Sequence, residues 1–245
     1  STPIPGTDYA IDNLLNPFVP ITLGDNIENA NKDAGIAMWG SVADAMLKYY
    51  LFIANGAYDY QSGMNAKGNP KYGIRIEFTP TMLGYKNSSG FTDQDTFMGA
   101  LNNLTVGFGY EQQKLDCPDN YGLCGNNTSS LTPEYYDIDA NWQQKFGNYI
   151  PEVQLGWAEK RNLMYGYKNA RVKSDGYYVQ IATLYDQTVG LGKPEIAFRW
   201  ENSDVKNMTY LNGQSGKINR YGIFVNYYIA GESARVSFGA DIVNP

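Results

Sequence analysis

The chain has 245 residues, a formal net charge of −6 and no histidine, and only 18% of its residues are charged. Histidine is the commonest general base and transition-metal ligand, so its absence leads us to expect neither an enzyme nor a metal or cofactor site. The acidic balance argues against a nucleic-acid partner, which requires a basic stripe. Tyrosine (21 residues) and glycine (26 residues) are abundant, which favours an all-β protein.

The first 33 residues contain four prolines and show no alternation of apolar and polar residues. We interpret residues 1–33 as a loop or plug-like segment and residues 34–245 as the strand-bearing domain. The opening residues lack the basic and apolar regions of a secretory signal. No run of about 18 apolar residues occurs anywhere in the chain, so no transmembrane helix is predicted.

From residue 34 onward the sequence alternates with a period of two, the pattern of β-strands with one apolar and one polar face. Most of these segments have about the 9–11 residues that a tilted membrane strand needs, whereas strands of soluble proteins average about 5–6. In chain order the ten predicted strands are Ala34–Ser41, Met46–Asn55, Tyr72–Pro80, Asn103–Gln112, Tyr135–Gln144, Glu152–Lys160, Gly176–Asp186, Lys193–Asp204, Asn219–Gly231 and Ala234–Val243.

The predicted connections alternate in length, as they do in outer-membrane β-barrels. The short ones are Ala43–Ala45, Phe146–Asn148, Thr188–Gly192 and Ala230–Glu232. The long polar ones are Gly56–Pro70, Asp116–Pro133, Arg161–Ser174 and Asn202–Gly216. Thr79–Ala100 departs from this order, because it is longer than its place in the alternation predicts.

The alternation alone fits two architectures. A soluble sandwich packs its apolar faces inward, and a membrane barrel turns them outward to lipid. Strand length, the asymmetry of the loops and the tyrosine and tryptophan content favour the barrel, in which Phe198 faces lipid and Arg199 faces the lumen. Trp142, Trp157 and Trp200 also fall on apolar faces, as in interfacial aromatic girdles.

The polar faces would then line a pore, and their charges are the candidate functional residues. They comprise six basic and seven acidic side chains, which predicts a mixed lumen in which many charges pair across strands. The pore-lining candidates are Lys48, Arg75, Glu77, Glu111, Asp137, Asp139, Lys160, Glu195, Arg199, Glu201, Arg220, Arg235 and Asp241.

Two segments resemble hairpins of the phosphate-selective porin family of bacterial outer membranes. "KDAGIAMWGSVADAMLKYYLFIANG" (Lys32–Gly56) is similar to a family hairpin that opens on Asp-x-Gly and ends on Asn-Gly. "NRYGIFVNYYIAGESARVSFGADIV" (Asn219–Val243) is similar to its late hairpin. The resemblance implies an antiparallel transmembrane barrel of about sixteen strands. It also implies a homotrimer in the bacterial outer membrane that passes small ions or solutes.

Departures from the family pattern qualify this expectation. Ten strands are fewer than the family has, and "DIVNP" lacks the usual terminal aromatic residue. We therefore expect a partial chain of a larger barrel, with a closed ten-stranded barrel as the alternative. Two other functions remain open: a secreted β-sandwich or lectin-like surface-binding protein, and a barrel that serves as a structural sheath or anchor for a partner in its lumen.

The two cysteines flank a turn-forming sequence, "CPDNYGLC". Its proline, aspartate, asparagine and glycine residues favour a tight surface loop. We interpret Cys117 and Cys124 as a disulfide, which implies an oxidising location, with two free thiols in a reducing compartment as the alternative.

Overall fold

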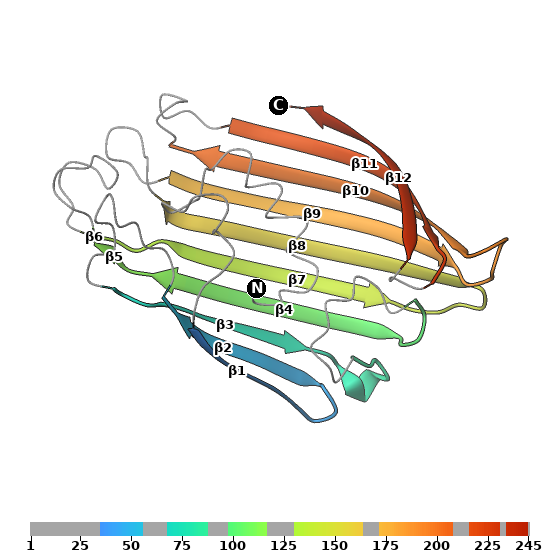
Figure 1. The fold of residues 1–245 in the computed structure, drawn as a ribbon, viewed down its shortest axis with the longest axis horizontal. Helices are drawn as coiled ribbons and strands as arrows, with labels where there is room; N and C mark the ends of the chain where they lie inside the picture. The colour runs from blue at the N-terminus through green and yellow to red at the C-terminus, as the bar shows by residue number, and fades with distance from the viewer. Residues whose placement is uncertain are drawn as a thin grey trace.

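The fold is a single curved antiparallel sheet of ten strands (Figure 1). The computed structural model describes residues 35–55, 68–87, 98–116, 130–163, 172–207, 216–230 and 234–244. Within these ranges no helix is long and apolar enough to cross a membrane. The segment 1–33 lies outside the described residues, as do Cys117 and Cys124, so the plug segment and the disulfide stay predictions.

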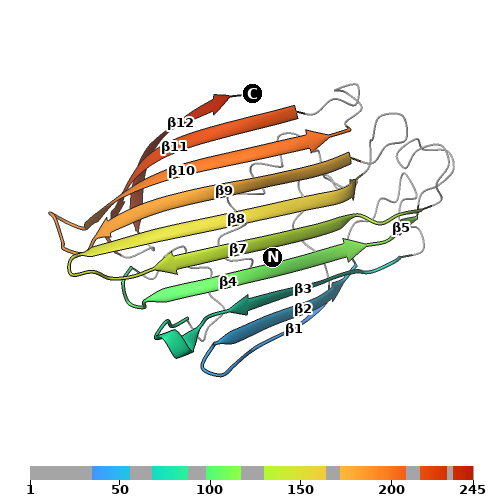
Figure 2. The ribbon, with the colours of Figure 1, turned by 180° about the vertical axis from the view of Figure 1, so that it is seen from behind.

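All ten predicted strands are present. In the order in which they lie side by side they are β1 (Gly35–Val42), β2 (Leu47–Ala54), β3 (Lys71–Phe78), β4 (Asn103–Gln113), β7 (Glu134–Gln143), β8 (Tyr149–Leu163), β9 (Val172–Tyr185), β10 (Lys193–Lys206), β11 (Gly216–Tyr228) and β12 (Arg235–Asn244). Each pairs antiparallel with the next, so the order in space follows the order in sequence (Figure 2).

Two small elements lie outside this sheet. The strands β5 (Leu115–Asp116) and β6 (Ser130–Leu131) belong to the connection from β4 to β7 and pair with each other. A short 3-10 helix, η1 (Thr81–Leu83), follows β3 and occupies part of the connection that the sequence marks as unusually long. Neither element was predicted, because two or three residues are too few to show a period.

Two predicted loops are shorter than expected. The structure continues β8 to Leu163 and begins β9 at Val172, and it continues β10 to Lys206 and begins β11 at Gly216. The loops Arg161–Ser174 and Asn202–Gly216 were therefore predicted to be longer than they are. The physical reason is that charged residues such as Arg161, Lys173 and Lys206 occupy the outward face at these strand ends, so the pattern of an apolar and a polar face is lost while the backbone ladder continues.

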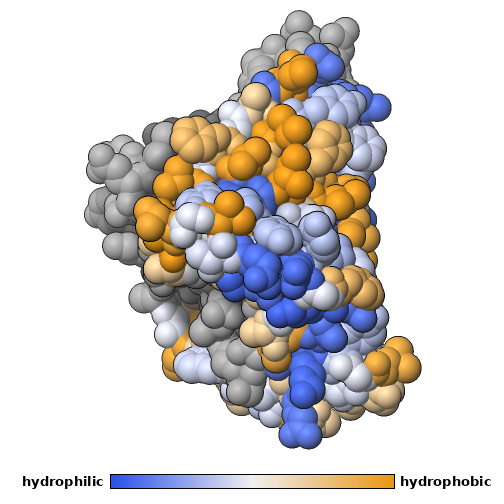
Figure 3. Space-filling model, turned by 90° about the vertical axis from the view of Figure 1, so that its right-hand side faces the viewer, coloured by the Kyte–Doolittle hydropathy of each residue, from blue (hydrophilic) through white to orange (hydrophobic). Residues whose placement is uncertain are grey.

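The short turns lie at one end of the sheet and the longer connections at the other, as the sequence predicts, except that the long β3–β4 connection with η1 lies at the short-turn end (Figure 1). Gly147 and Gly190 have positive φ angles of 59° and 68° in two of the short turns, a conformation that glycine adopts without steric cost. Figure 3 looks onto the short-turn end, where hydrophilic side chains form a central band with hydrophobic ones beside it.

The strands β1 and β12 form the two edges of the sheet, and each pairs with only one strand among the described residues. The two large sheets of a β-sandwich are therefore absent from the described part of the chain, which holds one large sheet and the small β5–β6 pair. The sheet has one apolar face and one polar face. The exposed fraction of the side chains on each face is therefore the observation that bears on function.

Candidate functional site

The polar face of the sheet holds all thirteen predicted pore-lining residues. Partners in the strand register share a face, and so do residues two apart on one strand. One row of partners across the sheet, from β2 to β11, consists of Lys48, Glu77, Gly107, Asp139, Gly156, Tyr178, Glu201 and Arg220. The other candidates lie an even number of residues from members of this row or of its continuation onto β12.

Burial on this sheet is inverted relative to a water-soluble protein. On the polar face Arg75, Asp137 and Glu201 are only 6%, 1% and 2% exposed. On the opposite face Ile181 and Phe198 are 51% and 48% exposed. Charged side chains are almost never fully buried in soluble proteins unless they are paired, and contiguous exposed apolar patches mark interaction surfaces.

Arg75 on β3 lies at the centre of a cluster of four charges. Its guanidinium Nη1 is 2.9 Å from Asp137 Oδ2, Nη2 is 2.7 Å from Asp139 Oδ2, and Nε is 3.1 Å from Glu77 Oε1. One cation thus bridges three carboxylates on β3 and β7, the pairing that lets charges be buried. We call these four residues the Arg75 cluster.

Two glycines of β4 make the Arg75 cluster possible. β4 lies between β3 and β7, with Gly109 opposite both Arg75 and Asp137, and Gly107 opposite both Glu77 and Asp139. A Cβ on Gly109 would lie within van der Waals overlap of the Asp137 carboxylate, and one on Gly107 would lie 2.5 Å from Arg75 Nη2. The guanidinium therefore crosses β4 where that strand has no side chains.

A second cluster lies on β9 to β12. Arg220 Nη2 is 2.5 Å from Asp241 Oδ2, and Arg220 also lies 3.8 Å from Glu201, which pairs with Arg199. The Arg199 guanidinium lies 5.1 Å from the centre of the Tyr178 ring, a cation–π geometry. This cluster has as many basic as acidic groups, whereas the Arg75 cluster has two more carboxylates than cations.

The remaining candidates lie nearer the edges or ends of the face. Lys48 is opposite Glu77, and Glu111 lies 3.5 Å from Lys71. Glu195 accepts hydrogen bonds from Asn226 Nδ2 at 2.7 Å and from the Tyr228 hydroxyl at 3.2 Å. Lys160 Nζ lies 5.7 Å from the Tyr135 ring, and the Arg235 guanidinium lies the same distance from the Tyr228 ring.

Sequence reasoning missed several polar-face residues. Glu152 accepts hydrogen bonds from Gln143 at 2.6 Å and from Gln154 at 2.5 Å. Glu152 lies two residues before Gln154, so the alternation itself places it on this face. Lys71 also faces this side, two residues before Gly73, and was left out because it lies just before the predicted strand.

Several atoms of the described polar face are shielded and make no hydrogen bond to the protein. They are Asn141 Oδ1, Arg199 Nη2, Glu201 Oε2 and Ser203 Oγ. An unsatisfied buried polar atom costs about 1–3 kcal/mol, so a face that carries several of them suits contact with water or a polar solute better than a dry core.

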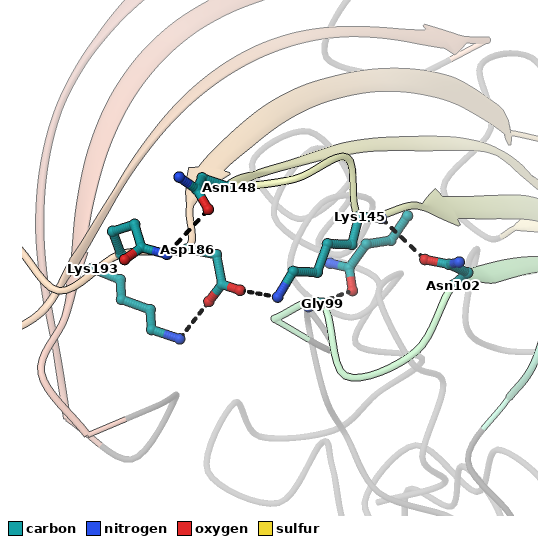
Figure 4. A network of polar contacts seen from close by, with 8 residues as sticks. Gly99, Asn102, Lys145, Asn148, Asp186 and Lys193 are labelled. Atoms are coloured by element: carbon teal, nitrogen blue, oxygen red, sulfur yellow. Dashed lines mark hydrogen bonds and ion pairs between the residues drawn. The ribbon is translucent and has the colours of Figure 1, made fainter.

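A polar network ties the short turns together (Figure 4). Lys145, in the β7–β8 turn, and Lys193, at the start of β10, both reach the carboxylate of Asp186 in the β9–β10 turn, Lys193 at 2.5 Å. Hydrogen bonds from Lys145 and then Lys193 hold the pKa of Asp186 below its ordinary value. The Lys145 backbone N–H also donates to Asn102 Oδ1, at 3.0 Å, ahead of β4.

A small apolar cluster lies on the polar face at the same end. Ile150, Leu184 and Tyr228 pack together with Met98 and are buried. The sequence places Leu184 on the polar face and Thr183 on the apolar one, against the general pattern, and the structure confirms it. The exception has a packing reason, since Leu184 is opposite Ile150 in the register of β8 and β9.

The apolar face has a centre of aliphatic and phenylalanine side chains between two rows of tyrosine and tryptophan residues. The long-loop aromatic row is Tyr110, Tyr136, Trp157, Tyr177, Trp200 and Tyr221, and the short-turn aromatic row is Trp142, Tyr149, Tyr185 and Tyr227. Tyr110 and Tyr136 are 4.9 Å apart between ring centres, and Tyr177 and Trp200 are 5.1 Å apart. Trp142, Trp157 and Trp200 thus lie on the predicted face.

The spacing of the two rows is close to the height of the apolar band on outer-membrane barrels. On β8, Tyr149 and Trp157 are eight residue steps apart, roughly 26 Å along the strand at about 3.3 Å per residue. A strand tilt of about 35–45° lowers this to roughly 20 Å in height, close to the band of about 25 Å found on outer-membrane barrels. Between the rows, no described side chain on this face carries a charge.

Among the described residues no group of three or more histidine, cysteine, aspartate or glutamate side chains is arranged to hold a metal ion. The prediction that the protein has no metal site, cofactor or catalytic centre stays a prediction. No protein-family model matches the chain, and no curated protein matches it either. The resemblance to phosphate-selective porins therefore rests on the two quoted segments alone.

Proposed function

We propose that this protein is a porin of the bacterial outer membrane, in which the polar face lines a water-filled channel for passive diffusion of small ions or solutes. One observation carries the proposal: charged side chains are covered while large apolar ones are exposed on the opposite face. Lipid is the solvent in which exposed isoleucine and phenylalanine are stable, and a wet lumen is the place for a continuous polar face.

Two further features support the membrane assignment. The aromatic rows match the interfacial girdles of membrane proteins, where amphipathic rings lie at headgroup level. The uncharged band between them, roughly 20 Å high, is close to the apolar band of about 25 Å on outer-membrane barrels. A secreted sandwich or lectin would instead cover its apolar face with a second sheet, and the described residues form one large sheet.

The proposal requires the barrel to be closed. In hydrocarbon an unpaired strand edge leaves backbone groups unsatisfied, at several kcal/mol each. β1 and β12 run antiparallel to each other, so they can pair directly or through an even number of further strands. The resemblance favours a barrel of about sixteen strands in a homotrimer.

Selectivity in such a channel would be set by pore width and by the charges of the polar face. Six basic and seven acidic candidates give a mixed lumen, and ion pairing in the two clusters leaves few full charges available to a solute. We therefore propose weak selectivity, in contrast to the strong anion preference that the family's name implies.

The test uses two neighbouring residues of β10 that face opposite sides. Phe198→Arg places a charge on the lipid face, which costs roughly 2–4 kcal/mol at the bilayer midplane and less near the interfaces, so folding into vesicles should fall. Arg199→Glu leaves the lipid face unchanged, so the chain should still insert, although less stably because the pairing with Glu201 is lost, and the reversal potential in planar bilayers should move toward cation selectivity. Equal tolerance of both changes in folding, or no conductance by the wild-type protein, would refute the proposal.

A further inference from the structure

Among the described residues, charges appear on the apolar face only beyond the long-loop aromatic row. On β8 to β11, Glu159 is opposite Asp175, Asp175 is opposite Asp204, and Asp204 is opposite Lys217. On each strand these positions lie an even number of residues from the exposed apolar residues, so they belong to the same, outward face. A row of three carboxylates ending in a lysine thus follows directly after the aromatic residues.

A row of cations lies one step further toward the long loops. Lys173 on β9 is opposite Lys206 on β10, and Arg161 lies two residues beyond Glu159 on β8. The Arg161 guanidinium is 4.9 Å from the centre of the Tyr136 ring, so the cations adjoin the aromatic row. We call Arg161, Lys173 and Lys206 the rim cations.

The carboxylates hold the rim cations in place and are themselves largely covered. Lys173 Nζ is 2.7 Å from Glu159 Oε2, and Arg161 binds the other oxygen of the same carboxylate. Lys206 Nζ is 3.3 Å from both Asp175 and Asp204.

Exposure separates the two kinds of charge. The rim cations are 39–48% exposed, whereas Glu159, Asp204 and Asp175 are 5%, 9% and 26% exposed. The surface presented to the surroundings is therefore basic, although acidic and basic groups are nearly balanced in number.

We propose that the rim cations bind the phosphate groups of anionic lipid headgroups in the leaflet on the long-loop side. The inference rests on the proposed porin function, because it needs the apolar face to lie in a bilayer. Aromatic girdle residues lie at headgroup level, so cations just beyond them meet the layer of lipid phosphates. The planar fork of Arg161 fits a phosphate in two-point contact, and lysines act as point charges beside it.

The test compares lipid enrichment around three forms of the full chain. The protein is placed in bilayers that mix phosphatidylglycerol with phosphatidylcholine, and the lipids that remain bound are counted by native mass spectrometry. The variant is Arg161→Gln/Lys173→Gln/Lys206→Gln, which keeps most of each stem. The control is Lys160→Gln, which removes a cation next to Arg161 on the same strand but on the polar face.

The wild-type protein and the control should both be enriched in phosphatidylglycerol. In the triple variant the enrichment should fall by a factor of at least about five, because removal of even one cation at an anionic surface weakens binding by about that factor. If the triple variant folds poorly, Lys206→Gln alone should lower the enrichment in the same direction. Undiminished enrichment in these variants, or an equal loss in Lys160→Gln, overturns the inference.

The two failures are distinguishable by an arm with phosphatidylcholine alone. Insertion into these vesicles depends on the apolar face and not on the rim cations. A protein that fails to insert there contradicts the porin proposal itself. A protein that inserts and conducts but shows no preference for phosphatidylglycerol contradicts only the lipid site.

Discussion

Replacing Arg75 with methionine should be the most damaging single change on the polar face. The side chain is 7% exposed and its guanidinium contacts three carboxylates at 2.7–3.1 Å. Each contact has a gross Coulomb energy of about 4 kcal/mol at an effective dielectric constant of about 20, most of it offset by desolvation. Removing one partner of a buried ion pair costs about 3–5 kcal/mol, because it leaves uncompensated charge behind.

The measurement is the free energy of unfolding in urea, with the protein reversibly folded into lipid vesicles and tryptophan fluorescence as the signal. Arg161→Met is the matched control, because Arg161 is 48% exposed and Glu159 keeps its pairing with Lys173 when Arg161 is replaced, so the loss should be about 1 kcal/mol. Adding Asp137→Asn and Asp139→Asn to Arg75→Met should restore much of the loss, since both asparagines are neutral and nearly isosteric. A cost for Arg75→Met no larger than that of Arg161→Met would refute the reasoning.

Three further predictions concern other parts of the chain. Gly109→Ala should lower the denaturation midpoint, because the added Cβ meets the Asp137 carboxylate. Gly109→Ala combined with Asp137→Gly should recover part of that loss. An unchanged midpoint in Gly109→Ala would contradict the passage of Arg75 across β4. Because the pKa of Asp186 is lowered in the folded state, the stability it contributes is full above its unfolded pKa of about 3.9 and is lost as the pH falls through the folded value. Asp186→Asn should therefore flatten the pH dependence of unfolding below about pH 4, and an unchanged slope would count against the Lys145–Asp186–Lys193 contacts. Intact-mass measurement after alkylation without reductant should find Cys117 and Cys124 unlabelled, and two labelled thiols would exclude the disulfide.

The alternation of residues was enough to predict the strands and their faces. Side chains with a period of two must fall on opposite sides of a strand, so Phe198 and Arg199 could be assigned before any pairing was known. Even the irregular strand Gly176–Asp186 was assigned correctly, with Leu184 on the polar face. The ends of β8 and β10 were missed, because there charged residues occupy the outward face and the pattern of an apolar and a polar face disappears.

The architecture of the polar face could not be predicted from a single strand. In sequence, Gly107 and Gly109 look like weak points of a strand, and only the pairing of β4 with both β3 and β7 makes them the passage for Arg75. The contact between Arg75 and Asp137 joins residues 62 apart, so it depends on register across two strand pairs. Sequence predicted that charges would pair across strands, but not which partner each would take.

Accessibility along β9 tests the central claim, that the apolar face contacts lipid, most directly. Spin labels would be placed one at a time at Val179, Gln180, Ile181 and Ala182 in a variant without Cys117 and Cys124, reconstituted in vesicles. The account predicts that collisions with oxygen, which concentrates in hydrocarbon, dominate at Val179 and Ile181, and that a water-soluble nickel complex reaches Gln180 and Ala182 more than their neighbours. The opposite alternation, or nickel access at Ile181 equal to that at Ala182, would contradict it.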